Sequence, residues 1–365
     1  MKQTRKRSRR GQRGCPRLPA ARSACAPAAQ FQGTASRCDG ITALCRMAQV
    51  HLLEYDSELE SVKCAAVLGH SAEVWAIAPA AAAADKFLTV HNSGGAYGIS
   101  LWQMDTEGSA LTELCGFPGL EGVVRSALWH PTDGSQVVSI EEGALRRWDL
   151  GNGSAAPGGT APADALQAFW GGAWSAADPA TLVTCAGNSL AVWDARSLAR
   201  TAEVESAHAM PVRDIDISRH NAHHMVTAGD DCKLRLWDLR KLGGDQPAGE
   251  PLQELGLGHS HWVWQGRLNP AHDELILSSS SDCLVNLWHV PPDGGSPPPA
   301  GSRAAAPGGS GAGVAGLAHT FDEHDDSVYG AAWSETDPWV FATLSYDGRV
   351  VVNQVPNGTK YKILL

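Results

Sequence analysis

Short runs of alternating hydrophobic and polar residues follow one another along the chain, and turn-forming residues separate them. Residues 211–217 read PVRDIDI, 224–229 read HMVTAG and 233–239 read KLRLWDL, with an Asp-Asp turn before the last run. Alternation with a period of two is typical of β-strands that bury one face. The pattern therefore predicts three antiparallel strands here, and a fourth strand in the segment that follows them.

This unit recurs with fixed spacing. Three histidines each precede a valine by four residues and an aspartate by 23, and a Ser or Thr lies four residues before each aspartate. The three sets are His208, Val212, Thr227 and Asp231, then His259, Val263, Ser278 and Asp282, then His324, Val328, Thr343 and Asp347. The position 29 residues after each histidine holds Trp237, Trp288 and Asn353. Matched offsets in three places identify an internal repeat, which decides the fold class.

Four strands in about 40–45 residues, opened by Gly-His and closed by Trp-Asp, resemble the WD repeat of a β-propeller. Earlier units depart from the pattern, with Glu142 and Gly187 where the turn aspartate is expected. Ahead of them, residues 31–36 and 49–55 read as strands of one more unit. The sequence therefore predicts an all-β, seven-bladed WD-repeat β-propeller with a degenerate first blade over residues 30–365.

A His–Asp pair invites interpretation as a catalytic dyad, but no enzyme needs three copies at one spacing. In WD repeats these side chains form a buried hydrogen-bonded chain, and buried polar groups need such partners. We therefore interpret the pairs as a structural staple in each blade. The staple residues are His208, Asp231, His259, Asp282, His324 and Asp347.

Composition agrees with a globular propeller, since 43% of the residues are hydrophobic and 19% are charged. No apolar run approaches the roughly 18 residues of a membrane-spanning helix, so no direct membrane insertion is expected. Nine cysteines without a CxxC pair indicate a reducing compartment. No catalytic residue, metal ligand, cofactor or small-molecule substrate is expected from the sequence.

Charge divides the chain. Ten of the 29 Lys and Arg residues lie in residues 1–38, which contain no acid, so the rest of the chain sets 19 basic residues against 39 acidic ones. That balance argues against nucleic-acid binding by the propeller. We expect residues 1–29 to be a basic, disordered extension. It reads as a targeting peptide, a basic tail of the nuclear-signal kind, or a solvated extension or misplaced start, and we favour the last two interpretations.

Two stretches rich in Pro, Gly and Ala are predicted to be linkers. They are residues 151–165 and the long segment 291–318, which we expect to form a disordered loop.

Function is expected on one face of the disc. The residue after the valine that opens an innermost strand lies on the rim of the central channel in WD propellers. These positions hold Trp75, Arg125, Trp170, Arg213, Trp264 and Tyr329, and Trp262 and Tyr346 are expected beside them. Trp, Tyr and Arg dominate binding hot spots, so we predict a protein-binding surface. The alternative is that Trp75, Trp170 and Trp264 only pack between blades.

Several motifs are more specific than a WD signature. They include DEHDDSVY at 322–329, LSYDG at 344–348, KYKILL at 360–365, HSHWVW at 259–264 and QVHLLEYD at 49–56. Over about residues 30–365 the chain resembles the family of EARP and GARP complex-interacting proteins. The resemblance implies a non-enzymatic adaptor that binds subunits of these tethering complexes. It implies support for their membrane recruitment, for endosome-to-Golgi transport and for recycling to the plasma membrane, in the cytoplasm beside the trans-Golgi network and endosomes.

A second class of function stays open. Trp193-Asp-Ala-Arg196 and Trp237-Asp-Leu-Arg240 both fit the Trp-Asp-x-Arg box through which some propellers dock on a cullin-RING ubiquitin ligase as substrate receptors. In that case Arg196 and Arg240 would carry the docking. An arginine at this position can also simply pair with a neighbouring acid.

Overall fold

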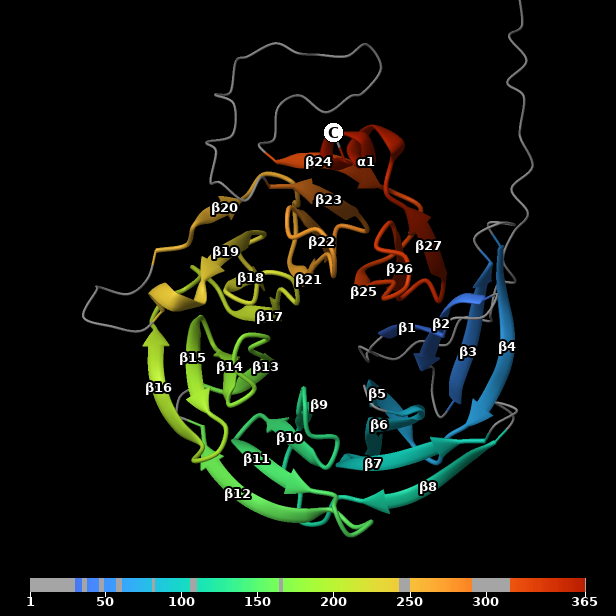
Figure 1. The fold of residues 1–365 in the computed structure, drawn as a ribbon, viewed down its shortest axis with the longest axis vertical. Helices are drawn as coiled ribbons and strands as arrows, with labels where there is room; N and C mark the ends of the chain where they lie inside the picture. The colour runs from blue at the N-terminus through green and yellow to red at the C-terminus, as the bar shows by residue number, and fades with distance from the viewer. Residues whose placement is uncertain are drawn as a thin grey trace, which may run out of the picture.

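The described strands form antiparallel sheets that stand in a ring around a central axis (Figure 1). The computed structural model describes residues 30–34, 38–45, 49–56, 61–80, 83–105, 110–163, 167–242, 250–290 and 316–364, and of the first two ranges only the backbone. Each sheet begins with its innermost strand and continues outward in chain order. The prediction of an all-β propeller is confirmed.

The first sheet contains β1 (Gln30–Thr34), β2 (Cys38–Cys45), β3 (Gln49–Asp56) and β4 (Ser61–Gly69). The second contains β5 (Glu73–Ala80), β6 (Ala83–Ser93), β7 (Ala96–Met104) and β8 (Leu111–Gly116). The third contains β9 (Val124–Trp129), β10 (Gln136–Glu141), β11 (Ala144–Asp149) and β12 (Ala156–Pro162). The fourth contains β13 (Phe169–Trp174), β14 (Thr181–Ala186), β15 (Ser189–Asp194) and β16 (Ala199–Val204).

The fifth sheet contains β17 (Val212–Ile217), β18 (His224–Gly229), β19 (Leu234–Asp238) and β20 (Gln253–Leu255), with the short 3-10 helix η1 (Leu239–Lys241) after β19. The sixth contains β21 (Val263–Leu268), β22 (Leu275–Ser280), β23 (Val285–His289) and β24 (Leu317–Phe321). The last contains β25 (Val328–Trp333), β26 (Val340–Ser345) and β27 (Val350–Gln354), and helix α1 (Asn357–Leu364) follows it.

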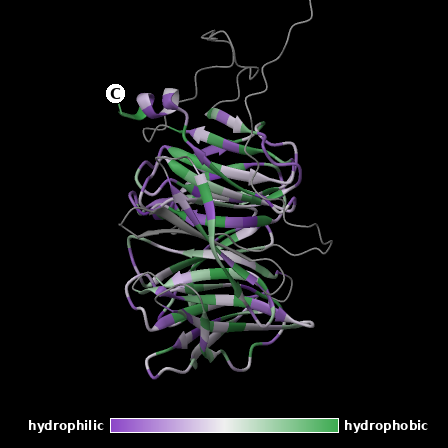
Figure 2. Ribbon diagram, turned by 90° about the vertical axis from the view of Figure 1, so that its right-hand side faces the viewer, coloured by the Kyte–Doolittle hydropathy of each residue, from purple (hydrophilic) through white to green (hydrophobic). Residues whose placement is uncertain are grey.

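The hydrophobic core lies between neighbouring sheets. Val183 and Leu190 of the fourth sheet share one cluster with Ile215, Met225 and Trp237 of the fifth. Apolar positions are concentrated along the strands, whereas the loops at the two faces of the disc are more hydrophilic (Figure 2). Each sheet therefore needs its neighbours to bury its apolar side chains, as expected for a repeat architecture.

Tryptophans near the ends of the innermost strands also join the sheets by hydrogen bonds. Trp129 Nε1 donates to the carbonyl oxygen of Ala78 at 2.9 Å, and Trp333 Nε1 donates to that of Arg267 at 3.1 Å. Trp174 holds the matching position in β13, but its buried Nε1 has no hydrogen-bond partner among the described residues. Two of these three tryptophans therefore join neighbouring sheets by a hydrogen bond.

The predicted strands of the repeat unit are confirmed as β17, β18 and β19, and β20 is the expected fourth strand. Two linker predictions were partly wrong. The predicted linker 151–165 contains β12, whose sequence APGGTAP is mostly exposed but pairs along β11 and buries Ala161. β24 begins at Leu317, inside the predicted loop 291–318. An outermost strand needs few apolar residues, so composition alone did not reveal either strand.

The two strands predicted ahead of the first clear repeat correspond to β1 and β3, whereas β2 and β4 were not predicted. The predicted extension 1–29 and most of the predicted loop, residues 291–315, lie outside the described residues. Among the described helices none is long and apolar enough to cross a membrane.

Candidate functional site

The first complete staple ties the loop before β17 to the turn after β18. His208 Nδ1 lies 2.9 Å from Asp231 Oδ1, and His208 Nε2 lies 2.7 Å from Thr227 Oγ1. Trp237 Nε1 donates to the same Thr227 oxygen at 2.9 Å. Asp231 also accepts the backbone N–H of Ala209. The four side chains therefore form one continuous buried chain.

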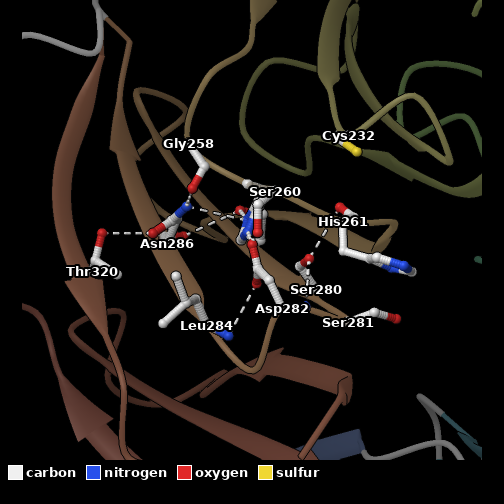
Figure 3. A network of polar contacts seen from close by, with 12 residues as sticks. Cys232, Gly258, Ser260, His261, Ser280, Ser281, Asp282, Leu284, Asn286 and Thr320 are labelled. Carbon is white, nitrogen blue, oxygen red and sulfur yellow. Dashed lines mark hydrogen bonds and ion pairs between the residues drawn. The ribbon is translucent and has the colours of Figure 1, made fainter.

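The second staple repeats this arrangement (Figure 3). His259 Nδ1 lies 3.1 Å from Asp282 Oδ2, and Ser278 Oγ is 2.7 Å from His259 Nε2 and 2.8 Å from Trp288 Nε1. Asn286 extends the network outward, because it donates to the Gly258 carbonyl and accepts from Thr320 of β24. This network reaches from the turn to the outermost strand.

The third staple is longer, and the second sheet has only part of a staple. His324 Nδ1 lies 3.4 Å from Asp347 Oδ2 and its Nε2 2.9 Å from Thr343 Oγ1, but Asn353 replaces the tryptophan. In the second sheet His70 contacts Thr89 Oγ1 and the Ala72 carbonyl, with no aspartate. The sequence departures thus correspond to missing members of the network.

Electrostatics within the staples favour charged aspartates. Burial opposes ionisation of Asp231 and Asp282, but hydrogen bonds and positive charge from His208 and His259 hold the pKa of each carboxyl below its ordinary value. Burial lowers the pKa of His324, although Asp347 opposes the shift. Each of these groups is engaged within its blade, and no group of three His, Cys, Asp or Glu side chains that could hold a metal ion occurs among the described residues.

The predicted rim residues of neighbouring blades contact one another. The Arg125 guanidinium carbon lies 4.0 Å from the centre of the Trp170 ring, and that of Arg213 lies 4.3 Å from it. Arg213 also lies 5.6 Å from the ring of Trp262 and 5.4 Å from that of Trp264. All are within cation–π range. We call these five residues the rim arc, and they come from four successive sheets, beginning with β9 and ending with the strand and loop of β21.

Both arginines of the rim arc are paired with acids. Arg213 donates from Nε and Nη2 to the two oxygens of Asp230, at 2.6 and 2.7 Å, and Arg125 pairs with Glu142. A bidentate pair fixes the guanidinium plane, so Arg213 is held in its stacked position. The rim arc consequently carries little net charge, although it contains two cations.

Serines extend the rim arc to the last sheet. Trp264 Nε1 lies 2.6 Å from Ser281 Oγ and 3.0 Å from Ser327 Oγ, and the two hydroxyls are 3.0 Å apart. Ser327 directly precedes β25, on which Tyr329 lies against Tyr346 with ring centres 4.4 Å apart. The indole of Trp264 therefore bridges two blades.

Exposure separates the predicted binding residues into groups. Trp262 and Tyr346 are 41% and 37% exposed, whereas Tyr329 is only 8% exposed. Trp75, Arg125, Trp170, Arg213 and Trp264 are half-buried. Trp75 lies outside the rim arc and packs edge-on against Tyr97 at 5.4 Å. A partner would therefore meet Trp262 and Tyr346 first, with the stacked side chains beneath them.

Several residues of this surface were not among the predicted contacts. Glu142 was recognised only as a substitute for the turn aspartate, and Ser327 and Tyr97 were not identified. Ser327 precedes Val328 as Trp262 precedes Val263, so its place on the rim could have been read from the repeat. The pairing of Tyr97 with Trp75 carries no such signal, because the equivalent positions of the regular copies hold no aromatic residue but Cys232, Cys283 and Gly348.

A charged group lies below the rim on the innermost strands. Asp214 and Asp216 of β17 accept backbone N–H groups of Gly266 and Leu268 in β21, at 3.2 and 2.8 Å. Arg267 pairs with Asp214. Burial raises the pKa of Asp214 to about 6, although the positive charge of Arg267 opposes the shift. These side chains join two neighbouring blades.

The two Trp-Asp-x-Arg boxes lie at the opposite face. β17 and β19 run in the same direction, since both are antiparallel to β18, so Arg240 after β19 is at the far end from Arg213. The exposed Arg240 donates to both oxygens of Asp238, at 3.0 and 2.8 Å. Arg196 is exposed, and its backbone N–H donates to Asp194. The pairing with a neighbouring acid is thus present at Arg240.

These features define a WD-repeat propeller in which aromatic and arginine side chains of neighbouring blades contact one another on one rim. A family model described as "EIPR1 beta-propeller" matches residues 19–288, and one described as "WD domain, G-beta repeat" matches residues 316–352. The chain therefore belongs to the EIPR1 β-propeller family.

Relatives support this assignment. EARP and GARP complex-interacting protein 1 is 32% identical to the chain in Rattus norvegicus and 30% identical in Homo sapiens, and in each case 87% of the chain and 89% of the relative are covered. WD repeat-containing protein DWA2 of Arabidopsis thaliana is 33% identical, over 84% of the chain and 86% of the relative.

Proposed function

We propose that the chain is a non-enzymatic adaptor that binds EARP and GARP tethering complexes through the rim arc. The observation that carries the proposal is the contact among Arg125, Trp170, Arg213, Trp262 and Trp264 across four blades. Stacked aromatic and arginine side chains lose little conformational entropy on binding, which is why they dominate hot spots. The names of the rat and human relatives supply the partner.

In this role the chain supports membrane recruitment of the tethering complexes, endosome-to-Golgi transport and recycling of cargo to the plasma membrane. It works in the cytoplasm, peripheral to the trans-Golgi network and endosomes. It is held there by its protein partners and needs no catalytic residue, cofactor or nucleic acid.

The proposal includes seven blades, of which β1–β4 form the first. Tyr55 of β3 supports this count, since it is buried against Ala332, Val340 and Ala342 of the last sheet. Gln354 of β27 also donates to the Tyr55 hydroxyl at 3.2 Å. The first sheet thereby closes the ring against the last one.

Direct binding to purified EARP and GARP complexes tests the function. We expect the double variant Arg213→Ala, Trp264→Ala to weaken binding at least about tenfold, because the two truncations remove hot-spot side chains. Arg219→Ala is the matched control, since this arginine is 69% exposed in the loop after β17, away from the rim arc. Unchanged melting temperatures would show that each variant folds. Wild-type affinity in the double variant would exclude the rim arc as the contact.

The alternative, a ubiquitin-ligase substrate receptor docking through Arg196 and Arg240, is favoured only by the exposure of these two arginines on the opposite face. Because the two candidate surfaces are separate, Arg196→Ala with Arg240→Ala discriminates between them. Loss of a cullin-ligase adaptor from this variant, with tethering complexes still bound by it, would establish the alternative as a second function.

A further inference from the structure

The last sheet has one strand fewer than the others in the part of the chain that the structure describes. β27 pairs with β26 along one edge, and no described strand pairs with its other edge. Figure 1 shows β27 as the outermost strand of its sheet, in the position that the third strand takes elsewhere. A free edge presents unpaired N–H and C=O groups to any strand that can approach.

In each of the other sheets the fourth strand covers one particular residue of the third strand. One equivalent residue near the start of the third strand is 0–3% exposed in all six of them. These residues are Val50, Ile99, Leu145, Leu190, Leu234 and Val285. The fourth strand, or in the second sheet the residue directly after it, places an apolar side chain beside each of them. These side chains are Leu68, Phe117, Ala161, Val204, Leu255 and Phe321.

Val350 holds the same position in β27 and lacks this cover. It pairs with Leu344 of β26 as Leu234 pairs with Ala228 of β18, yet Val350 is half-exposed, as are Val351 and Val352. Half-exposed β-branched residues on a free edge are unusual, because proteins generally guard such edges with Lys or Pro. The described edge residues from Val350 to Gln354 contain neither.

Comparison of the strand register with the other sheets shows in which direction the backbone N–H and C=O groups of β27 point. Leu236 stands in β19 where Val352 stands in β27, and its carbonyl accepts the Leu252 N–H at 2.7 Å on the outer side. The carbonyl of Ile99, the counterpart of Val350, likewise accepts the N–H of Phe117. In an antiparallel ladder a residue directs its N–H and C=O to the same side. The N–H and C=O groups of Val350 and Val352 therefore face away from β26.

We infer that the free edge of β27 binds an extended segment of a partner protein, which adds a fourth strand antiparallel to β27 and places a bulky apolar side chain beside Val350. Such strand addition takes its affinity from main-chain hydrogen bonds and its specificity from alternate side chains. The inference concerns a surface separate from the rim arc and does not rest on the proposed partner complexes.

The composition of the chain favours a partner's strand over one of its own. Residues 1–29 contain nine Lys and Arg residues, and residues 291–315 are mostly Pro, Gly, Ala and Ser. Leu18 and Val314 are their only branched aliphatic residues. Neither segment has the alternation of apolar residues that would cover Val350 and continue along the edge.

Peptide selection tests the inference without assuming a partner. Random peptides displayed on phage are selected on the full chain, and the affinities of enriched synthetic peptides are measured by fluorescence anisotropy. We expect some of the selected peptides to contain apolar residues at every second position. We also expect Val352→Pro to weaken their binding at least about tenfold, because proline removes an outward N–H without removing a bond to β26. Val352→Thr is the matched control and should bind within about twofold of wild type, since it keeps the N–H and the branched shape.

Further variants test whether a loss of peptide binding comes from the edge of β27. Val350→Lys keeps every backbone N–H but places a charge at the uncovered position, so it should also lose peptide binding. If Val352→Pro melts at a lower temperature than wild type, Val350→Lys takes its place in the test. Arg213→Ala with Trp264→Ala should bind the same peptides as wild type does. Hydrogen exchange at residues 350–354 should slow when the peptide is bound.

Four results would overturn the inference. The first is that selection yields no peptide sensitive to Val352→Pro or Val350→Lys. The second is that bound peptide leaves exchange at residues 350–354 unchanged. The third is a dimer of the chain that dissociates on Val352→Pro, which would assign the edge to a second copy. The last is slow hydrogen exchange at residues 350–354 in the free chain that becomes fast when residues 1–29 are deleted. That result would assign the edge of β27 to a segment of the chain itself.

Discussion

At the scale of single residues, His259 and Asp282 show how a repeated polar pair stabilises a blade. Their side chains are only 1% and 6% exposed, and each has several partners in the same network. We expect His259→Ala or Asp282→Ala to lower the free energy of unfolding by about 1–3 kcal/mol, because truncation leaves buried polar groups without partners. Urea denaturation measures the change. The exposed His220, replaced by Ala, is the control, and a stability equal to wild type in both staple variants would contradict the role.

Asp214 carries a prediction about pH. Its folded-state pKa of about 6 lies above the ordinary value of 3.8, so the folded protein binds this proton more tightly than the unfolded chain does. Its contribution to stability is therefore greatest below about pH 4, falls as the pH rises toward 6, and changes no further above that. The total change is of the order of 3 kcal/mol. Asp214→Asn should remove this part of the pH dependence, measured by urea denaturation across that range; identical slopes in both proteins would contradict it.

At the scale of elements, Trp129, Trp174 and Trp333 provide a matched comparison. They hold equivalent positions on their strands, but among the residues that the structure describes only Trp129 and Trp333 find an acceptor in a neighbouring sheet. Replacement by Phe should cost about 1 kcal/mol more at these two positions than at Trp174, where it removes a buried N–H that has no acceptor. Thermal melting of the three variants checks the order. Equal losses at all three would show that packing alone matters.

The sequence predicted elements well where strands have a buried face. The strands at 212–217, 224–229 and 234–238 could be recognised because apolar residues and turn residues repeat in them. β12 could not, because an outermost strand of Ala, Pro, Gly and Thr pairs through its backbone and buries little. β24 was hidden for the same reason at the end of a Gly-rich segment.

At the scale of the whole molecule, the rim arc combines positive charges with paired acids. Because Glu142 and Asp230 already neutralise its arginines, partner binding through the rim arc should depend weakly on ionic strength. We expect the Kd for a purified tethering complex to rise less than about tenfold between 0.05 and 0.5 M NaCl. Binding measured in both buffers checks this. A much steeper loss would indicate a contact through unpaired charges elsewhere.

Part of the candidate site could be predicted from the sequence. The repeat register placed Arg125, Trp170, Arg213 and Trp264 at equivalent positions, and the structure brings them into contact. The acids that pair with the arginines, and the burial of Tyr329 beneath Tyr346, depend on side-chain directions between blades. A one-dimensional period carries no information about those directions.

The contact between Tyr55 and Gln354 has a consequence for how the molecule is made. The two residues are 299 positions apart, and Tyr55 packs against strands that leave the ribosome long after it does. At roughly 5–20 residues per second, synthesis of that interval takes about 15–60 s. During this time the apolar surface around Tyr55 stays uncovered, because the strands of the last sheet that bury it have not yet been synthesised. The nascent chain therefore offers chaperones a binding site whose lifetime is set by translation, and slower translation of the codons between Tyr55 and Gln354 should prolong it.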